Sequence, residues 1–196
     1  MAVYKDIKYN TPISNGGQEV LLQTLTANES ATVSFTTNID SSFKSYIVRF
    51  IQVHAETNDK HLTFQASTDG GGSYGTTITT NAYRTSLKED NSFTFFGAVT
   101  GNDINSGTGF KIINEGQGND NDNSSSGQLE LYSPSDTTFV KHWVCRIQNM
   151  NFQSSPQSVD YHTQGYFNTT SAINALQFKM SGGDIDAGTF KLYGIN

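Results

Sequence analysis

The sequence HLTFQAS, residues 61–67, alternates apolar and polar side chains. Successive side chains of a β-strand point to opposite faces of the sheet, so Leu62, Phe64 and Ala66 are predicted to face inward. The polar residues between them are predicted to face solvent. The stretch is therefore expected to form a half-buried strand, as in antiparallel sheets with one face in water.

The same period of two recurs along most of the chain, and helical periodicity is nowhere sustained. Residues Ala27–Ser30 are expected to form a hairpin loop between a strand at 20–26 and a strand at 31–37. The spacing predicts roughly nine or ten strands, and hence an all-β, antiparallel β-sandwich. The predicted strands are 20–26, 31–37, 45–55, 61–67, 92–98, 128–132, 138–147, 160–167, 175–180 and 189–195.

The stretch SYIVRFIQVHA, residues 45–55, is apolar on both faces. One face carries Tyr46, Val48 and Phe50, and the other carries Ile47, Ile51 and Val53. This pattern predicts a strand that is covered on both sides.

Composition predicts one domain with a leading arm. The chain has 196 residues, of which 35% are hydrophobic and 12% aromatic, enough apolar area for one core. Residues 1–17 end at the breaker Asn15-Gly16-Gly17 and are expected to form an arm or linker, with a single sandwich domain at 18–196.

Charge and hydropathy argue against two classes of partner. The net charge is −6 and the basic residues are scattered, so we expect no binding to nucleic acid. No stretch approaches the roughly 20 apolar residues of a membrane helix, so neither a membrane partner nor a secretory signal is expected.

The sequence nominates no catalytic, cofactor-binding or metal-binding residue. Cys145 is the only cysteine and alternates with Trp143 and Ile147, which predicts a buried thiol. The four histidines lack metal-ligand spacing, and no G-x-S-x-G elbow is present. We expect no enzyme activity and no cofactor.

Two loops invite a ligand interpretation, and in each the plainer interpretation is preferred. The acidic loop at 114–127 could offer oxygen ligands to calcium, but it lacks the EF-hand spacing and is expected to be solvated and flexible. The Gly-rich segment at 68–74 precedes a strand, not a helix, and is expected to be a hairpin turn stabilised by Asp69.

Two segments resemble one another, GNDINSGTGFKI at 101–112 and GGDIDAGTFKLY at 182–193. Equivalent corners of two sheets would explain the similarity, and so would chance convergence on good turn residues.

Tyrosines on the predicted strands are candidates for surface contacts, because their rings can stack on sugars or pack in protein interfaces. The interface or core role is preferred over glycan binding. The candidate exposed aromatic contacts are Tyr83, Tyr132, Tyr161, Tyr166 and Tyr193.

Three longer stretches carry a family resemblance: 44–77, 130–147 and 165–195. The closing pair, an I-x-x-L-x-F strand followed by SGGDIDAGTFKLYGI, is the most characteristic. The chain resembles virion structural proteins of tailed bacteriophages, particularly marine ones. The resemblance implies a jelly-roll-like sandwich mounted on a virion, assembled in the cytoplasm of the infected bacterium.

The place on the virion is left open by the residues. The lack of heptads or a repetitive shaft favours a capsid-associated decoration or accessory protein, with other virion proteins as partners and a small cyclic homo-oligomer, such as a trimer, as the assembly. The alternatives are a tail or tail-fibre component that binds a cell-surface glycan, and a glycan-processing enzyme, for which no carboxylate is nominated.

The leading arm is expected to dock on a neighbouring chain. Tyr4, Ile7 and Tyr9 alternate and would serve as anchors of an extended segment. The competing interpretation is a loose terminus without a role.

Overall fold

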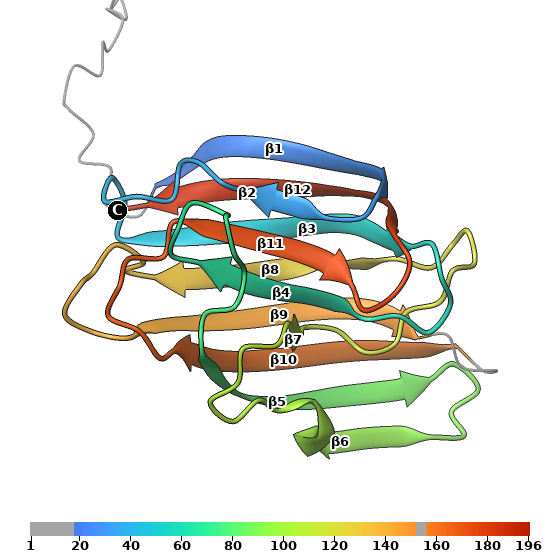
Figure 1. Ribbon diagram of the computed structural model, residues 1–196. Helices are drawn as coiled ribbons and strands as arrows, with labels where there is room; N and C mark the ends of the chain where they lie inside the picture. The colour runs from blue at the N-terminus through green and yellow to red at the C-terminus, as the bar shows by residue number, and fades with distance from the viewer. Residues whose placement is uncertain (1–17, 152–155) are drawn as a thin grey trace, which may run out of the picture.

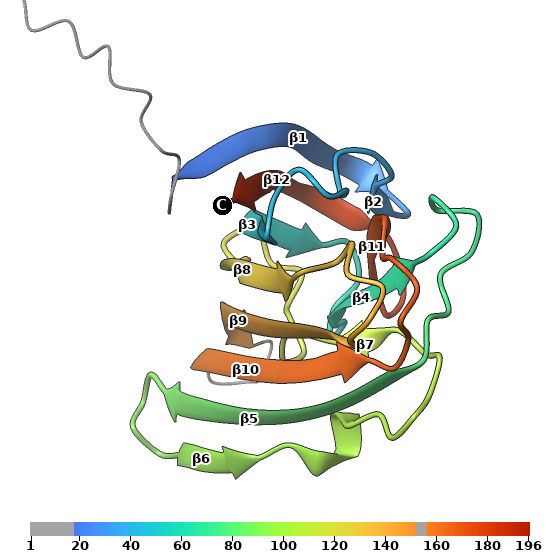
Figure 2. The same cartoon turned by 90° about the vertical axis from the view of Figure 1, so that its left-hand side faces the viewer.

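The computed structural model describes residues 18–151 and 156–196, and within them twelve strands, all paired antiparallel, form two sheets. In Figure 1 the smaller sheet lies in front of the larger one, and Figure 2 shows the two layers from the side. The protein is therefore an all-β, antiparallel sandwich, as the period of two predicts. The strand order is compatible with a jelly-roll-like arrangement.

The larger sheet has eight strands and the smaller sheet four. In spatial order the larger sheet contains β1 (Glu19–Ser30), β12 (Ile185–Ile195), β3 (Ser45–Ala55), β8 (Ser125–Tyr132), β9 (Lys141–Asn151), β10 (Gln157–Phe167), β5 (Ile78–Lys88) and β6 (Thr94–Ala98). The smaller sheet contains β2 (Val33–Phe35), β11 (Ala175–Met180), β4 (Leu62–Ser67) and β7 (Lys111–Ile112). A short 3₁₀ turn, Thr100–Asn102, follows β6.

The chain passes repeatedly between the sheets, which corrects two predicted hairpins. β1 continues through the expected loop Ala27–Ser30 and pairs with β12, while β2 joins the other sheet. Residues 68–74 likewise link β4 to β5 across the sandwich, so they are not a hairpin turn. Local turn residues show that the chain reverses, but they do not show which sheet receives the next strand.

A β-bulge in β3 changes which side chains face the core. The register with β8 shifts between Phe50 and Val53, and Gln52 has a positive φ of 50°. As a result Val53 joins the inward face, whereas Ile51 is 38% exposed. The prediction that β3 is covered on both sides is therefore wrong at Ile51.

The outward face of β4 is covered, contrary to the half-buried prediction. Gln65 is fully buried, and its Nε2 donates to the carbonyls of Thr108 and Gly109, at 3.1 and 3.0 Å. Thr63 is also buried and donates to the carbonyl of Lys179 at 2.8 Å. Carbonyl oxygens of a loop and of the neighbouring strand β11 thus satisfy polar side chains that alternation alone assigns to solvent.

The main core lies between the two sheets and centres on aromatic rings. The Phe178 ring of β11 lies within 6.4 Å, between ring centroids, of rings from β2, β3, β4 and β12. Trp143 of β9 packs edge-on against Phe64 at 4.8 Å. Such contacts between large apolar side chains hold the layers together.

The two similar segments differ in structure. Phe190 lies in the middle of β12 and is fully buried, whereas Phe110 precedes β7 and is partly exposed beneath the ammonium of Lys179, 4.0 Å from the ring centroid. Lys111 is fully buried and Lys191 is not. These differences favour chance convergence on turn-forming residues.

Candidate binding site

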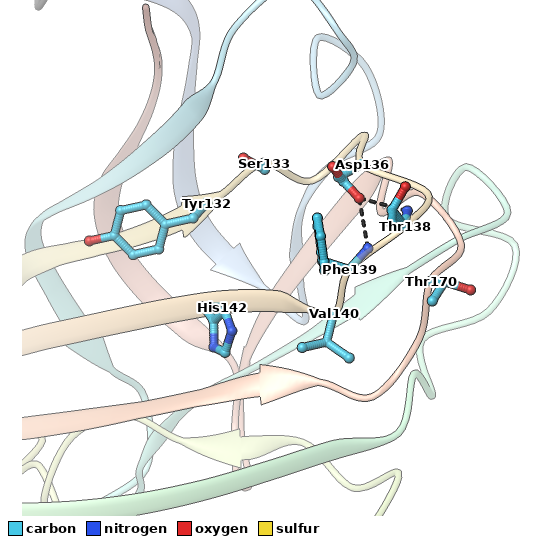
Figure 3. A pocket seen from close by; sticks show the side chains of 8 residues that line it. All are labelled: Tyr132, Ser133, Asp136, Thr138, Phe139, Val140, His142 and Thr170. Carbon is cyan, nitrogen blue, oxygen red and sulfur yellow. Dashed lines mark hydrogen bonds between the residues drawn. The ribbon is translucent and has the colours of Figure 1, made fainter.

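The connection between β8 and β9, residues 133–140, forms the wall of a surface cup of about 550 Å³. Figure 3 shows the Tyr132 and Phe139 rings on either side of the cup, with His142 on β9 below them. Thr170 contributes from the connection between β10 and β11. The volume falls within the range of about 300 to 1,000 Å³ that is usual for small-molecule sites.

Phe139 is the most unusual residue of the cup, because its side chain is 70% exposed. The alternation of residues 138–147 places it on the same face as the buried Trp143. β9 begins only at Lys141, however, so Phe139 belongs to the loop and turns outward. The sequence analysis missed this residue; the signal for it was the sequence Ser-Pro-Ser-Asp at 133–136, which disfavours a strand.

Asp136 fixes the loop that carries Phe139. Its Oδ1 accepts hydrogen bonds from the backbone N–H groups of Thr138 and Phe139, at 2.6 and 2.7 Å. These N–H groups, Phe139 first, hold the pKa of the Asp136 carboxyl below its ordinary value. The loop is also tied to its surroundings, since Ser133 N–H donates to the carbonyl of Lys44 at 2.7 Å.

Lys141 fixes the same loop from beneath. Its side chain is fully buried, and Nζ donates to the carbonyl oxygens of Phe139 at 2.9 Å and Thr169 at 3.3 Å. Burial lowers the pKa of Lys141, which the charge of Asp136 partly offsets. One ammonium therefore ties together the two connections that line the cup.

Tyr132 and His142 supply the remaining rings. The Tyr132 hydroxyl donates to Oε2 of Glu130 at 3.1 Å, and burial, together with Glu130, raises the pKa of Tyr132. The His142 ring lies 6.1 Å from that of Tyr166, measured between centroids, on the neighbouring strand β10. The cup thus combines aromatic faces with a carboxylate, hydroxyls and an imidazole.

Four of the five tyrosines selected from the sequence reach the surface to different extents. Tyr132 and Tyr83 are exposed, and Tyr83 stacks on His162 at 4.7 Å between centroids. Tyr166 is partly buried, as is Tyr193, whose ring lies beneath the guanidinium of Arg49 at 4.9 Å. Among them, Tyr132 alone lines the cup.

The prediction for Tyr161 is wrong, because its side chain is 0% exposed. It packs in a small second cluster with Ala82 and Val159, and its hydroxyl accepts a hydrogen bond from Asn102 Nδ2 at 3.2 Å. Burial raises the pKa of Tyr161 to about 12. The period of two places it on the face that turns out to point inward.

Tyr4, Ile7 and Tyr9 lie outside the described residues. The expectation that they anchor a docking arm therefore remains a prediction.

The acidic segment at 114–127 is less solvated than predicted. Asn114 and Gln117 are fully buried, and Gln117 Nε2 donates to the carbonyl of Val53 at 2.7 Å. Asn114 Oδ1 accepts from the N–H of Leu62 at 2.6 Å. Hydrogen bonds from amide side chains to backbone groups allow the first part of this apolar-free segment to be buried, whereas residues 119–122 are exposed, as predicted.

Other predicted features have plain structural roles. Asp69 Oδ1 accepts from the N–H of Ser73 at 2.9 Å, which confirms its turn-stabilising role. Cys145 is buried in the core, as predicted, and burial raises the pKa of its thiol. In the described part of the chain, no group of three or more His, Cys, Asp or Glu side chains is placed to hold a metal ion.

A second fully buried lysine, Lys111, lies beneath the segment after β6. Its Nζ donates to the carbonyl of Asn102 at 2.6 Å and lies 3.8 Å from Oδ1 of Asp103. Burial lowers the pKa of Lys111 to about 8, although Asp103 opposes this shift. This amine ties the covering segment to the sheet and reaches no part of the cup.

No family model, curated protein or solved structure matches the chain. Within residues 18–151 and 156–196, no helix has the length and apolar character to cross a bilayer.

Proposed function

We propose that the protein is a non-enzymatic structural protein of a tailed-phage virion, attached to the capsid as a decoration or accessory protein and assembled there as a small cyclic oligomer. The observation that carries the proposal is the open outer face of the larger sheet. β9 exposes every second side chain along its first eight residues: His142, Val144, Arg146 and Gln148. A broad, rigid sheet face is suited to contact with neighbouring chains.

Apolar side chains on this sheet support a role in assembly. Among the described residues, several exposed large apolar side chains belong to its strands: Leu21, Ile51, Tyr83, Leu87, Phe96 and Val144. Exposed apolar groups that gather on one surface mark interaction sites more often than single scattered ones. The resemblance of the closing strands to phage virion proteins supports the same proposal.

The copy number in purified virions tests the proposal. Quantitative mass spectrometry of whole particles should find the protein in numbers that match the sites of a capsid lattice, and separated heads should retain it. A few copies confined to isolated tails would contradict the capsid assignment and favour the tail or tail-fibre alternative.

A charge on the open face should block assembly without unfolding the domain. Val144→Glu is expected to abolish oligomers in light scattering and to prevent incorporation into particles, because an unpaired carboxylate would be desolvated in the contact. Thr32→Glu, on the exposed link between β1 and β2, is the matched control. Normal assembly of Val144→Glu would show that this face is not the interface.

A further inference from the structure

We propose that the cup between Tyr132 and Phe139 is a saccharide-binding site. The inference is independent of the place of the protein on the virion, since it depends only on the chemistry of the cup.

The first step is that Phe139 is held in place although it is exposed. Its N–H is bound by Asp136 and its carbonyl oxygen by the buried ammonium of Lys141, at 2.7 and 2.9 Å. The main chain that carries the ring is therefore ordered before a ligand arrives, which lowers the entropy cost of binding. Lysine is rarely fully buried, and here its ammonium fixes the main chain of the loop that carries the exposed ring.

The second step is the pairing of apolar and polar groups. The rings of Tyr132 and Phe139 and the side chain of Val140 contribute apolar surface to the lining, and Asp136 contributes a carboxylate. Asp136 uses Oδ1 for the loop, and within the described residues no hydrogen bond engages its Oδ2. Ligand sites commonly consist of such apolar walls with a few polar groups that fix orientation.

The third step is the choice of ligand. A pyranose has an apolar face of C–H groups, which packs on an aromatic ring, and a rim of hydroxyls that can donate to a carboxylate. A nucleotide is disfavoured because Asp136 and the net charge of −6 repel phosphate. A purely apolar peptide side chain would leave the Asp136 carboxylate desolvated without a partner.

The site extends beyond one sugar ring. A neighbouring hollow of about 210 Å³ shares Ser133 and Asp136 with the cup and is lined further by Phe43 and Lys44. A second ring could therefore be bound on the other side of Asp136, so an oligosaccharide fits the surface better than a monosaccharide.

The test uses the full chain and an array of bacterial O-antigen and capsular oligosaccharides, with positive glycans confirmed by saturation-transfer NMR. The wild-type chain should bind at least one of them. Phe139→Ala should weaken binding about tenfold or more, because the stacking ring is lost, whereas Phe139→Trp should retain it. Phe93→Ala is the matched control, since Phe93 is an exposed aromatic residue before β6 that lines no part of the cup.

The positioning role of Lys141 has its own control. Lys141→Met should lower the affinity for the same saccharide, while circular dichroism shows an intact fold. Lys111→Met removes the other fully buried lysine and should leave this affinity unchanged. The proposal is overturned if no glycan on the array binds the wild-type chain. Equal losses of affinity in Phe139→Ala and Phe93→Ala would overturn it as well.

Discussion

At the scale of single residues, the two buried lysines show how this protein uses charge in its interior. Lys111 and Lys141 are both 0% exposed, and each donates to backbone carbonyl oxygens. Burial of an ammonium is unfavourable unless hydrogen bonds and a counter-charge compensate. Each lysine therefore holds a loop in place at some cost in stability.

Lys111→Met should stabilise the protein near neutral pH. The pKa of Lys111 falls from 10.5 to about 8 on folding, so the unfolded chain binds this proton more tightly. The destabilisation is fully present below about pH 8 and disappears as pH rises to the unfolded value. We expect the variant to gain about 1 to 2 kcal/mol in free energy of unfolding at pH 7.

Urea unfolding at several pH values measures this effect. The advantage of Lys111→Met over the wild type should shrink steadily between pH 8 and 10.5. An advantage that does not change with pH would show that lost or gained packing, not the buried charge, causes it.

At the scale of elements, close strand pairing leaves no room for a side chain at Gly127. Gly127 of β8 lies opposite Ile147 of β9, and an added Cβ would clash with the Arg146 carbonyl oxygen and lie 2.7 Å from the Ile147 Cα. Both obstacles are backbone atoms in the middle of the sheet, so they cannot move without disturbing the register.

Gly127→Ala should therefore lower the free energy of unfolding by about 1 to 3 kcal/mol. Gly75→Ala is the matched control, since its added Cβ meets no atom within 4 Å, and it should change stability by less than about 0.5 kcal/mol. Thermal unfolding of the two variants side by side measures the difference. Equal melting temperatures would mean that β8 and β9 can separate locally without loss of stability.

The elements also show what the sequence could and could not predict. Alternation predicted most strands and the inward direction of Phe64 and Cys145, because side-chain direction is a local property of a strand. It did not predict the bulge at Gln52 or the buried state of Tyr161, because these depend on how distant strands pair and on which face of β10 turns inward. Phe139 was missed for a related reason. It lies in the loop before β9, so its side chain does not follow the inward direction that the alternation of the strand predicts.

At the scale of the whole molecule, the sandwich should unfold as one unit. Strands close in space are often distant in sequence, so local segments share few contacts that could persist alone. Trp143, the only tryptophan, is buried between the sheets and reports on their contact. Its fluorescence and the far-ultraviolet circular dichroism should follow the same denaturant transition.

Phe178→Ala tests how strongly the two layers depend on each other. The ring contacts Phe35, Phe50, Phe64 and Phe190 from both sheets, and its removal should cost about 3 to 5 kcal/mol. The two spectroscopic signals should shift to lower denaturant together. Separation of the signals into two steps would show that the sheets can unfold independently.

Because Cys145 is buried, a cysteine introduced on the surface can be labelled selectively. Thiol reagents attack the thiolate, and burial both hides this sulfur and raises its pKa. Since the chain has no other cysteine, one introduced at an exposed position, such as Gln128 on the open sheet or Thr138 beside the cup, would be its single reactive thiol. A dye or photo-crosslinker attached there would report which molecules contact each face, while the native residue stays unlabelled.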